Sequence, residues 1–178
     1  MVRRLVAALA LMLGTTADAQ MSAPAAIPAV RPAGAISYQT YCLDGCKIYW
    51  FQVQSDGLGL FRGERGTATI GAASFKVSPE HFAALVAALD QYRPDGERMV
   101  NKDMPECAPV GTDPLFVTVD WLATLDYHSE AEMNVGGGML EFDLACNPDK
   151  NAKMIDALRN APALIPELRP FIDGTAGH

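Results

Sequence analysis

Alternating apolar and polar positions between residues 36 and 77 predict a run of β-strands. In residues 36–41, Ile36, Tyr38 and Thr40 fall on one side of a strand and the intervening residues on the other. Residues 48–53 are largely apolar on both sides, as expected of a central strand that is covered on both faces. Further strands are predicted over residues 58–63 and over residues 67–77, the latter interrupted by Gly71. Glycine-containing turns at residues 55–57 and 64–66 would join the four strands into an antiparallel meander.

Helical periodicity follows the predicted meander. Ser78 is a favourable N-cap and Pro79 suits the first helical position. An apolar stripe with helical spacing then predicts a helix that ends by residue 93. Asn147-Pro148 repeats the cap-and-proline start and predicts a second helix. The stripes of the two helices consist of Phe82, Leu85, Val86 and Leu89, and of Met154, Ile155 and Leu158.

The remaining segments complete the predicted fold. Residues 97–114 have no clear period and predict a long loop, whereas residues 115–121 and 139–145 predict strands. Prolines 162, 166 and 170 should break the tail into short turns. We therefore expect a single α+β domain over residues 36–173, with a mainly antiparallel sheet and two main helices packed on one of its faces.

The first 35 residues have a different pattern. Arg3 and Arg4 precede a short apolar run at residues 5–13, and Ala17-Asp18-Ala19 offers small residues for signal-peptidase cleavage near Ala19/Gln20. This pattern predicts a signal peptide over residues 1–19, followed by a flexible Pro/Ala-rich linker over residues 20–35. We therefore expect a periplasmic or secreted protein with no membrane span in the mature chain.

Charge narrows the choice of partner only slightly. Cleavage after Ala19 would leave 12 basic and 20 acidic residues, a net charge of −8. An acidic chain of this kind disfavours nucleic acid as a partner. The expected partner is thus a protein or a small-molecule ligand whose identity the sequence does not define.

Four cysteines, Cys42, Cys46, Cys107 and Cys146, lie in the predicted mature chain. An even number in an oxidising compartment favours disulfides, and four cysteines permit three connectivities. We favour Cys42–Cys46 with Cys107–Cys146, because the first two are close enough to close a tight loop. A redox-active Cys42/Cys46 pair is the alternative, although its spacing is longer than the C-x-x-C motif at a helix start that lowers a thiol pKa.

The sequence contains candidate residues for two further kinds of chemistry, copper binding and hydrolysis. Soft ligands in or near the predicted loops, including Met104, Cys107, His128 and Met133, suit copper, but they lack a concentrated spacing, and loop packing is the favoured interpretation. Carboxylates near His128 could support a small hydrolase, yet no nucleophile elbow or H-E-x-x-H motif accompanies them. These acidic residues are Asp103, Glu106, Asp113, Glu130 and Glu132. We therefore assign no catalytic residue, no metal site and no cofactor.

The order of motifs resembles a family of small bacterial domains known only as a domain of unknown function. The family pattern has a loop near C-x-G-x-C-P-x-Y between two strands, then a D-G turn, a helix with Phe-x-x-Leu and a T-D-x-P loop. The matching residues are Cys42, Cys46, Tyr49, Asp56, Gly57, Phe61, Gly63, Phe82, Leu85, Thr112, Asp113 and Pro114. Here the loop glycine, Gly45, comes one place later, and Lys47 replaces the usual proline. The resemblance implies a fold and no established activity.

These observations favour a non-enzymatic, exported, disulfide-stabilised module that binds a ligand or associates with the envelope. A periplasmic thiol-redox or copper-handling protein is the alternative hypothesis. A small carboxylate-based hydrolase is the third.

Overall fold

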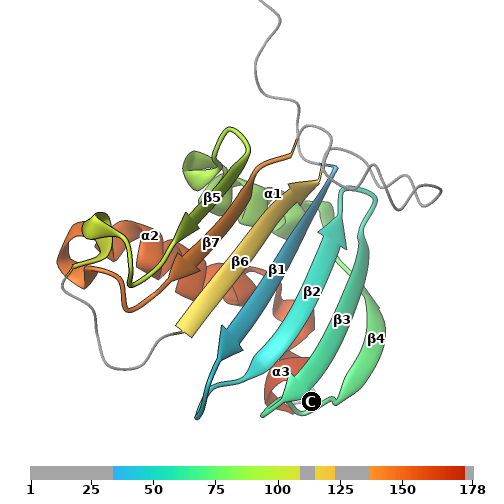
Figure 1. The fold of residues 1–178 in the computed structure, drawn as a ribbon. Coiled ribbons are helices and arrows are strands. Elements are labelled where there is room, and N and C mark those ends of the chain that lie inside the picture. Colours follow the sequence, from blue (N-terminus) through green and yellow to red (C-terminus); the bar gives the residue numbers. More distant parts are fainter. Residues whose placement is uncertain (1–33, 109–114, 123–136, 175–178) are drawn as a thin grey trace, which may run out of the picture.

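A single mixed sheet organises the computed structural model, which describes residues 34–108, 115–122 and 137–174. Within these residues the sheet has seven strands in the order β4-β3-β2-β1-β6-β7-β5 (Figure 1). The first four strands form the predicted antiparallel meander. Their bounds are Ala35–Cys42 (β1), Ile48–Gln54 (β2), Leu58–Arg65 (β3) and Gly71–Lys76 (β4).

The other half of the sheet extends from the free side of β1. Strand β6 (Leu115–Leu122) pairs antiparallel with β1 along its whole length, and β7 (Met139–Asp143) pairs antiparallel with β6. Strand β5 (Glu97–Val100) pairs parallel with β7 at the sheet edge. The prediction that residues 97–114 form only a loop was therefore wrong. A four-residue edge strand is too short to show a period, and its pairing depends on a partner about 40 residues away.

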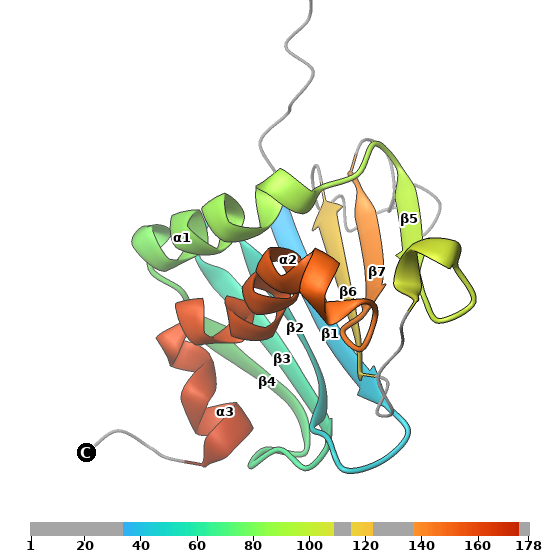
Figure 2. The same cartoon turned by 90° about the vertical axis from the view of Figure 1, so that its left-hand side faces the viewer.

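The helices lie together on one face of the sheet (Figure 2). Helix α1 (Pro79–Leu89) starts at Ser78, whose Oγ accepts a hydrogen bond from the His81 backbone N–H at 3.2 Å. Helix α2 (Pro148–Asn160) starts at Asn147, whose side chain accepts from the Lys150 N–H. Both starts agree with the sequence, and the observed architecture confirms the predicted α+β class.

The tail contains more helix than its prolines indicate. Short 3-10 turns at Ala161–Leu164 and Pro166–Leu168 are followed by helix α3 (Arg169–Asp173), in a segment predicted to hold only turns. Pro170 lies within the first two positions of α3. A backbone N–H at these positions has no acceptor within the helix, so proline, which lacks this group, is tolerated there. Two other 3-10 turns, Asp90–Tyr92 and Pro105–Cys107, lie outside the tail.

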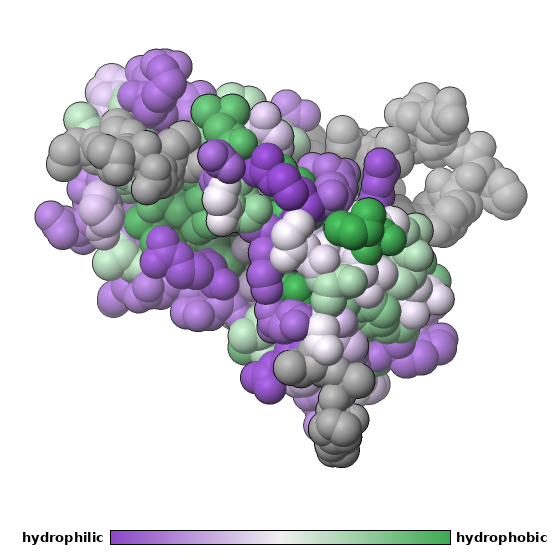
Figure 3. Space-filling model, turned by 90° about the horizontal axis from the view of Figure 1, so that it is seen from below, coloured by the Kyte–Doolittle hydropathy of each residue, from purple (hydrophilic) through white to green (hydrophobic). Residues whose placement is uncertain are grey.

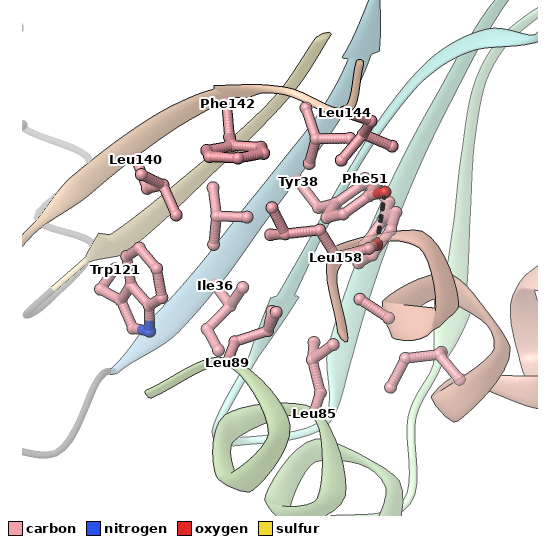
Figure 4. Close-up of a cluster of buried hydrophobic side chains, with 14 of the residues drawn as sticks. Ile36, Tyr38, Phe51, Leu85, Leu89, Trp121, Leu140, Phe142, Leu144 and Leu158 are labelled. Carbon is pink, nitrogen blue, oxygen red and sulfur yellow. Dashed lines mark hydrogen bonds between the residues drawn. The ribbon is translucent and has the colours of Figure 1, made fainter. Parts of the chain in front are cut away.

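The hydrophobic core fills the space between the sheet and its helices. Aromatic and aliphatic side chains from β1, β2, β6, β7, α1 and α2 meet there (Figure 4). The fully buried members include Ile36, Tyr38, Phe51, Leu85, Leu89, Trp121, Leu140, Phe142 and Leu158. Burial of this apolar area is the main contribution to folding stability.

The opposite face of the sheet is not covered by these helices. Trp50 on β2 is half-buried there, and its Nε1 donates to the Ser37 Oγ at 2.7 Å. The prediction of a central strand at residues 48–53 agrees with the structure, because β2 lies between β1 and β3 and Trp50 is the only residue of this range that is not buried. No helix in the described ranges is long and apolar enough to cross a membrane. Residues 1–33, which hold the predicted signal peptide and nearly all of the linker, lie outside the description.

Candidate functional site

One disulfide closes the loop after β1, and the other lies beside the start of α2. Cys42 at the end of β1 bonds Cys46, with a Cα–Cα distance of 6.2 Å, and Cys107 bonds Cys146, with a Cα–Cα distance of 4.5 Å. This is the connectivity favoured from the sequence. Cys107 and Cys146 are completely buried. The Cys42–Cys46 loop is on the surface, and Leu43 within it is 73% exposed.

A cleft opens at the end of the molecule where the Cys42–Cys46 loop and α3 lie. It consists of two adjoining cavities of about 530 and 290 Å³, which share Tyr49, Arg159, Ile172 and Asp173. Seen from this end, a hydrophobic recess is bordered by hydrophilic residues (Figure 3). The walls therefore combine the β1–β2 hairpin with the C-terminal segment.

Two tyrosines line the smaller cavity, which we call the inner cavity because the buried Tyr38 lines it. The Tyr38 hydroxyl donates to the Leu158 carbonyl at 2.9 Å. Burial raises the pKa of Tyr38, with a further increase from Tyr49 that Arg159 partly offsets. Burial raises the pKa of Tyr49 too, and the charge of Asp173 adds to this effect. Both phenols are consequently protonated near neutral pH, so Tyr38 donates to Leu158 and the Tyr49 hydroxyl is able to donate to a ligand.

Tyr49 belongs to an aromatic stack that continues into the core. Its ring centroid lies 6.0 Å from that of Phe61, and Phe61 stacks in turn on Phe171 of α3 at 5.4 Å. Tyr38 stacks on Phe51 at 5.0 Å. These contacts fix the position of the tyrosine rings before any ligand arrives.

Two of the charged side chains that line the cleft form an ion pair with each other, and the two arginines do not. Lys47 Nζ contacts the Asp173 Oδ1 at 2.5 Å and donates to the Ile172 carbonyl at 3.2 Å. Arg159 and Arg169 are exposed, and neither guanidinium has a hydrogen-bond or ion-pair partner among the described residues. The Lys47–Asp173 pair neutralises the acidic side chain of the cleft and leaves the two arginines available.

The soft-ligand candidates are not brought together in the described part of the chain. Cys107 is bonded to Cys146, and Met104 packs against the hydrophobic core. His128 and Met133 lie outside the described residues. Within the ranges described, three or more histidine, cysteine or acidic side chains do not gather into a group that could hold a metal ion.

The acidic candidates for hydrolysis are likewise separate where they are described. Asp103 pairs with Lys102 at 3.0 Å, and Glu106 pairs with Arg98 at 3.4 Å. Asp113, Glu130 and Glu132 lie outside the described residues, as do Thr112 and Pro114 of the motif order.

His81 makes a contact that the sequence did not indicate. Its Nδ1 lies 2.8 Å from the Glu167 Oε1, 86 positions along the chain. This pair joins the start of α1 to the C-terminal segment.

Residues 35–107 match the family model described as domain of unknown function DUF6438. This part of the chain is therefore similar to a domain family whose function is uncharacterised. No curated protein and no solved structure matches the chain. The DUF6438 segment runs from β1 to Cys107 and includes Lys47 and Tyr49, whereas Arg159, Arg169 and Asp173 lie beyond it.

The residues that line the cleft were not singled out from the sequence as a site. They are spread over more than 120 positions and follow no motif. Two signals were present: Lys47 replaces the proline of the resembled pattern, and Arg159 and Arg169 flank the proline-rich start of the tail. Neither signal indicates that the tail folds back beside β1 and β2.

Proposed function

We propose that this disulfide-stabilised protein is an exported, periplasmic binding module that holds a small-molecule ligand in its cleft without chemically changing it. The observation that carries the proposal is the cleft itself. Its larger cavity, about 530 Å³, falls in the size range of small-molecule sites, and its tyrosine and aliphatic walls carry a few polar groups that can orient a ligand.

Export is supported by the leader pattern and by the cysteines. A basic start, a short apolar run and Ala17-Asp18-Ala19 are typical of secretory signal peptides. Two disulfides suit an oxidising compartment. N-terminal sequencing of the full chain expressed in a bacterium and recovered from the periplasm should give Gln20 as the first residue. Recovery of the uncleaved chain from the cytoplasm would contradict this part of the proposal.

Binding in the cleft can be tested with a fragment mixture of neutral, cationic and anionic molecules, followed by NMR. We expect shifts for Tyr49 and Ile172, and loss of binding when Ala163→Trp fills the mouth of the larger cavity. Ala152→Trp is the matched control, since Ala152 is exposed on α2 and does not line either cavity. If no fragment binds, or if Ala163→Trp has no effect, the cleft is not a binding site.

A specific contact favours thiol-redox activity as a second candidate. Arg65 donates from Nη2 to the Cys42 carbonyl at 3.0 Å, and the same nitrogen lies 3.4 Å from the Cys42 Sγ. A guanidinium beside a sulfur stabilises the thiolate that forms on reduction. The Cys42–Cys46 reduction potential, measured in a glutathione buffer, tests this candidate. Redox activity would require a potential near that of known exchange catalysts, and an Arg65→Ala variant with a lower potential.

A further inference from the structure

We propose that the ligand of the cleft is a small organic carboxylate with an apolar body. Arg159 and Arg169 would bind the carboxylate, and the inner cavity would receive the apolar part. This inference rests on the proposed binding function and names the chemical class of its ligand.

The charge of the cleft differs in sign from that of the chain. The whole chain carries a net charge of −7, whereas the cleft is lined by three cationic side chains and one acidic one. The acidic one, Asp173, is already paired with Lys47. A concave surface of positive charge on an acidic protein attracts anions locally, while the rest of the surface repels them.

The available donors suit a carboxylate. A guanidinium presents parallel N–H groups that match the two oxygens of a carboxylate, and both arginines are free to do so among the described residues. The Tyr49 hydroxyl, protonated and with no hydrogen-bond partner in the described part of the chain, adds a neutral donor. The two guanidinium groups and the Tyr49 hydroxyl are donors that have no acceptor among the described residues. They therefore favour an anionic ligand over a cationic one.

A ligand that fills the inner cavity needs an apolar part as well as a charged group. Its walls include Leu115, Val117 and Leu144 together with the rings of Tyr38 and Tyr49. A head group alone would leave this apolar surface in contact with water, so the apolar body supplies much of the affinity. Because Arg159 lines both cavities, one molecule can contact the guanidinium and the apolar walls together.

A set of probes with one body and different heads tests the ligand class. We would titrate the oxidised full chain with 4-phenylbutyrate, 4-phenylbutylamine, 4-phenylbutan-1-ol, 4-phenylbutyl phosphate and acetate, and follow Tyr49 and Ile172 by NMR. The expected result is that 4-phenylbutyrate binds at least about tenfold more tightly than the amine and the alcohol, a difference that one charge-assisted hydrogen bond can supply. Acetate should bind only weakly.

Other results would overturn the inference in distinguishable ways. Equal or tighter binding of the amine or the alcohol would exclude an anionic ligand but keep the cleft as a binding site. Clearly tighter binding of the phosphate ester would replace the carboxylate with a phosphate. Absence of any shift at Tyr49 and Ile172 with all five probes would contradict the binding function as well.

Substitution of the arginines provides the second arm. Arg159→Gln and Arg169→Gln should each weaken 4-phenylbutyrate binding about tenfold and leave 4-phenylbutan-1-ol binding unchanged. Arg62→Gln is the matched control, because Arg62 is exposed on β3 and lines neither cavity, yet its loss changes the net charge equally. An equal effect of all three substitutions would show that only overall charge matters, and would overturn the assignment.

Discussion

Asn147 combines three roles in one residue at the start of α2. Its backbone lies in the left-handed region at a φ of 37°, as does no other non-glycine residue in the described ranges. Its backbone N–H donates to the Cys107 carbonyl at 3.1 Å, and its Nδ2 donates to the Ala108 carbonyl at 2.7 Å. Asparagine tolerates this conformation better than most residues, and its amide satisfies groups on both sides of the Cys107–Cys146 bridge.

Asn147→Ala should therefore destabilise the protein by about 2 kcal/mol, about half from the lost N-cap and half from the left-handed backbone. Asn147→Gly should be less destabilising, because glycine adopts positive φ freely. Urea unfolding of the two variants measures the difference. Inside a helix the expected order is the opposite, because glycine destabilises a helix more than alanine does. If the alanine variant is the more stable of the two, the left-handed backbone of Asn147 does not have the proposed role.

Asp120 on β6 is unfavourably placed in its charged form. Burial raises its pKa above the ordinary 3.8, and the charge of Glu97 adds to the increase. Its strand neighbours are Ser37 on β1 and Met139 on β7. The folded state therefore binds a proton more tightly than the unfolded state does, and stability falls as the pH rises through the folded pKa.

Asp120→Asn should raise the melting temperature at pH 7, because asparagine lacks the charge that burial and Glu97 disfavour in the folded state. The advantage should disappear below about pH 3.8, where Asp120 is protonated in both states. Glu97→Gln should give a smaller gain of the same sign. Thermal melts across this pH range measure the effect, and an advantage that persists at pH 3 would point to packing instead of charge.

At the scale of elements, the two disulfides differ in their surroundings. Cys42 and Cys46 close a surface loop between two strands, whereas Cys107 and Cys146 are fully buried beside the start of α2. The buried bridge has a sequence separation of 39, compared with 4 for the surface bridge. A longer closed loop constrains the unfolded chain more strongly.

We expect stepwise reduction under native conditions. Titration with a phosphine reductant, followed by alkylation and peptide mapping, should label Cys42 and Cys46 before Cys107 and Cys146. Replacement of the buried pair, Cys107→Ala with Cys146→Ala, should lower the free energy of unfolding by about 4 kcal/mol, and replacement of the surface pair by less. Earlier labelling of the buried pair would contradict this order.

The elements that the sequence predicted correctly are those with strong local signals. The α1 start depends on Ser78 and Pro79, and the meander depends on short apolar strand patterns and glycine turns, so neighbours in sequence contain the information. Strand β5 and helix α3 were missed because their stability comes from distant partners. Val100 becomes buried only beside β7, and Phe171 packs only where β3 and β4 present Phe61 and Phe75.

For the whole molecule, the C-terminal segment is the part that joins the separate layers. Glu167 contacts His81 at the start of α1, Phe171 packs on Phe61, and Asp173 contacts Lys47. The segment thereby reaches α1, β3 and the β1–β2 hairpin within seven residues. Since none of these contacts is local, the cleft could not be predicted from the sequence, although each of its residues was visible there.

The Glu167 contact should make this docking sensitive to acid. Burial alone would raise its pKa, but hydrogen bonds from its own backbone N–H, from His81 and from the Ser78 N–H together lower the pKa below the ordinary 4.5. The stabilisation is complete above pH 4.5 and is lost as the pH falls through the lower folded pKa.

Glu167→Gln should accordingly destabilise the protein by less than about 1 kcal/mol at pH 6, and the difference should be smaller at pH 3. Urea midpoints at the two pH values measure it. Glu64→Gln, which removes the exposed partner of Arg62, is the control and should have little effect at either pH. A constant difference at both pH values would exclude the charge as its cause.

The division of the cleft between two parts of the chain has an evolutionary consequence. Lys47 and Tyr49 lie in the segment that matches DUF6438, and Arg159 and Arg169 lie beyond it. Arg159 on α2 and Arg169 on α3 are exposed, so their substitution should not disturb the sheet, its core or either disulfide. Under the proposed binding function, we therefore expect proteins that share the matched segment to differ in the ligand they bind while the sheet and its core stay the same.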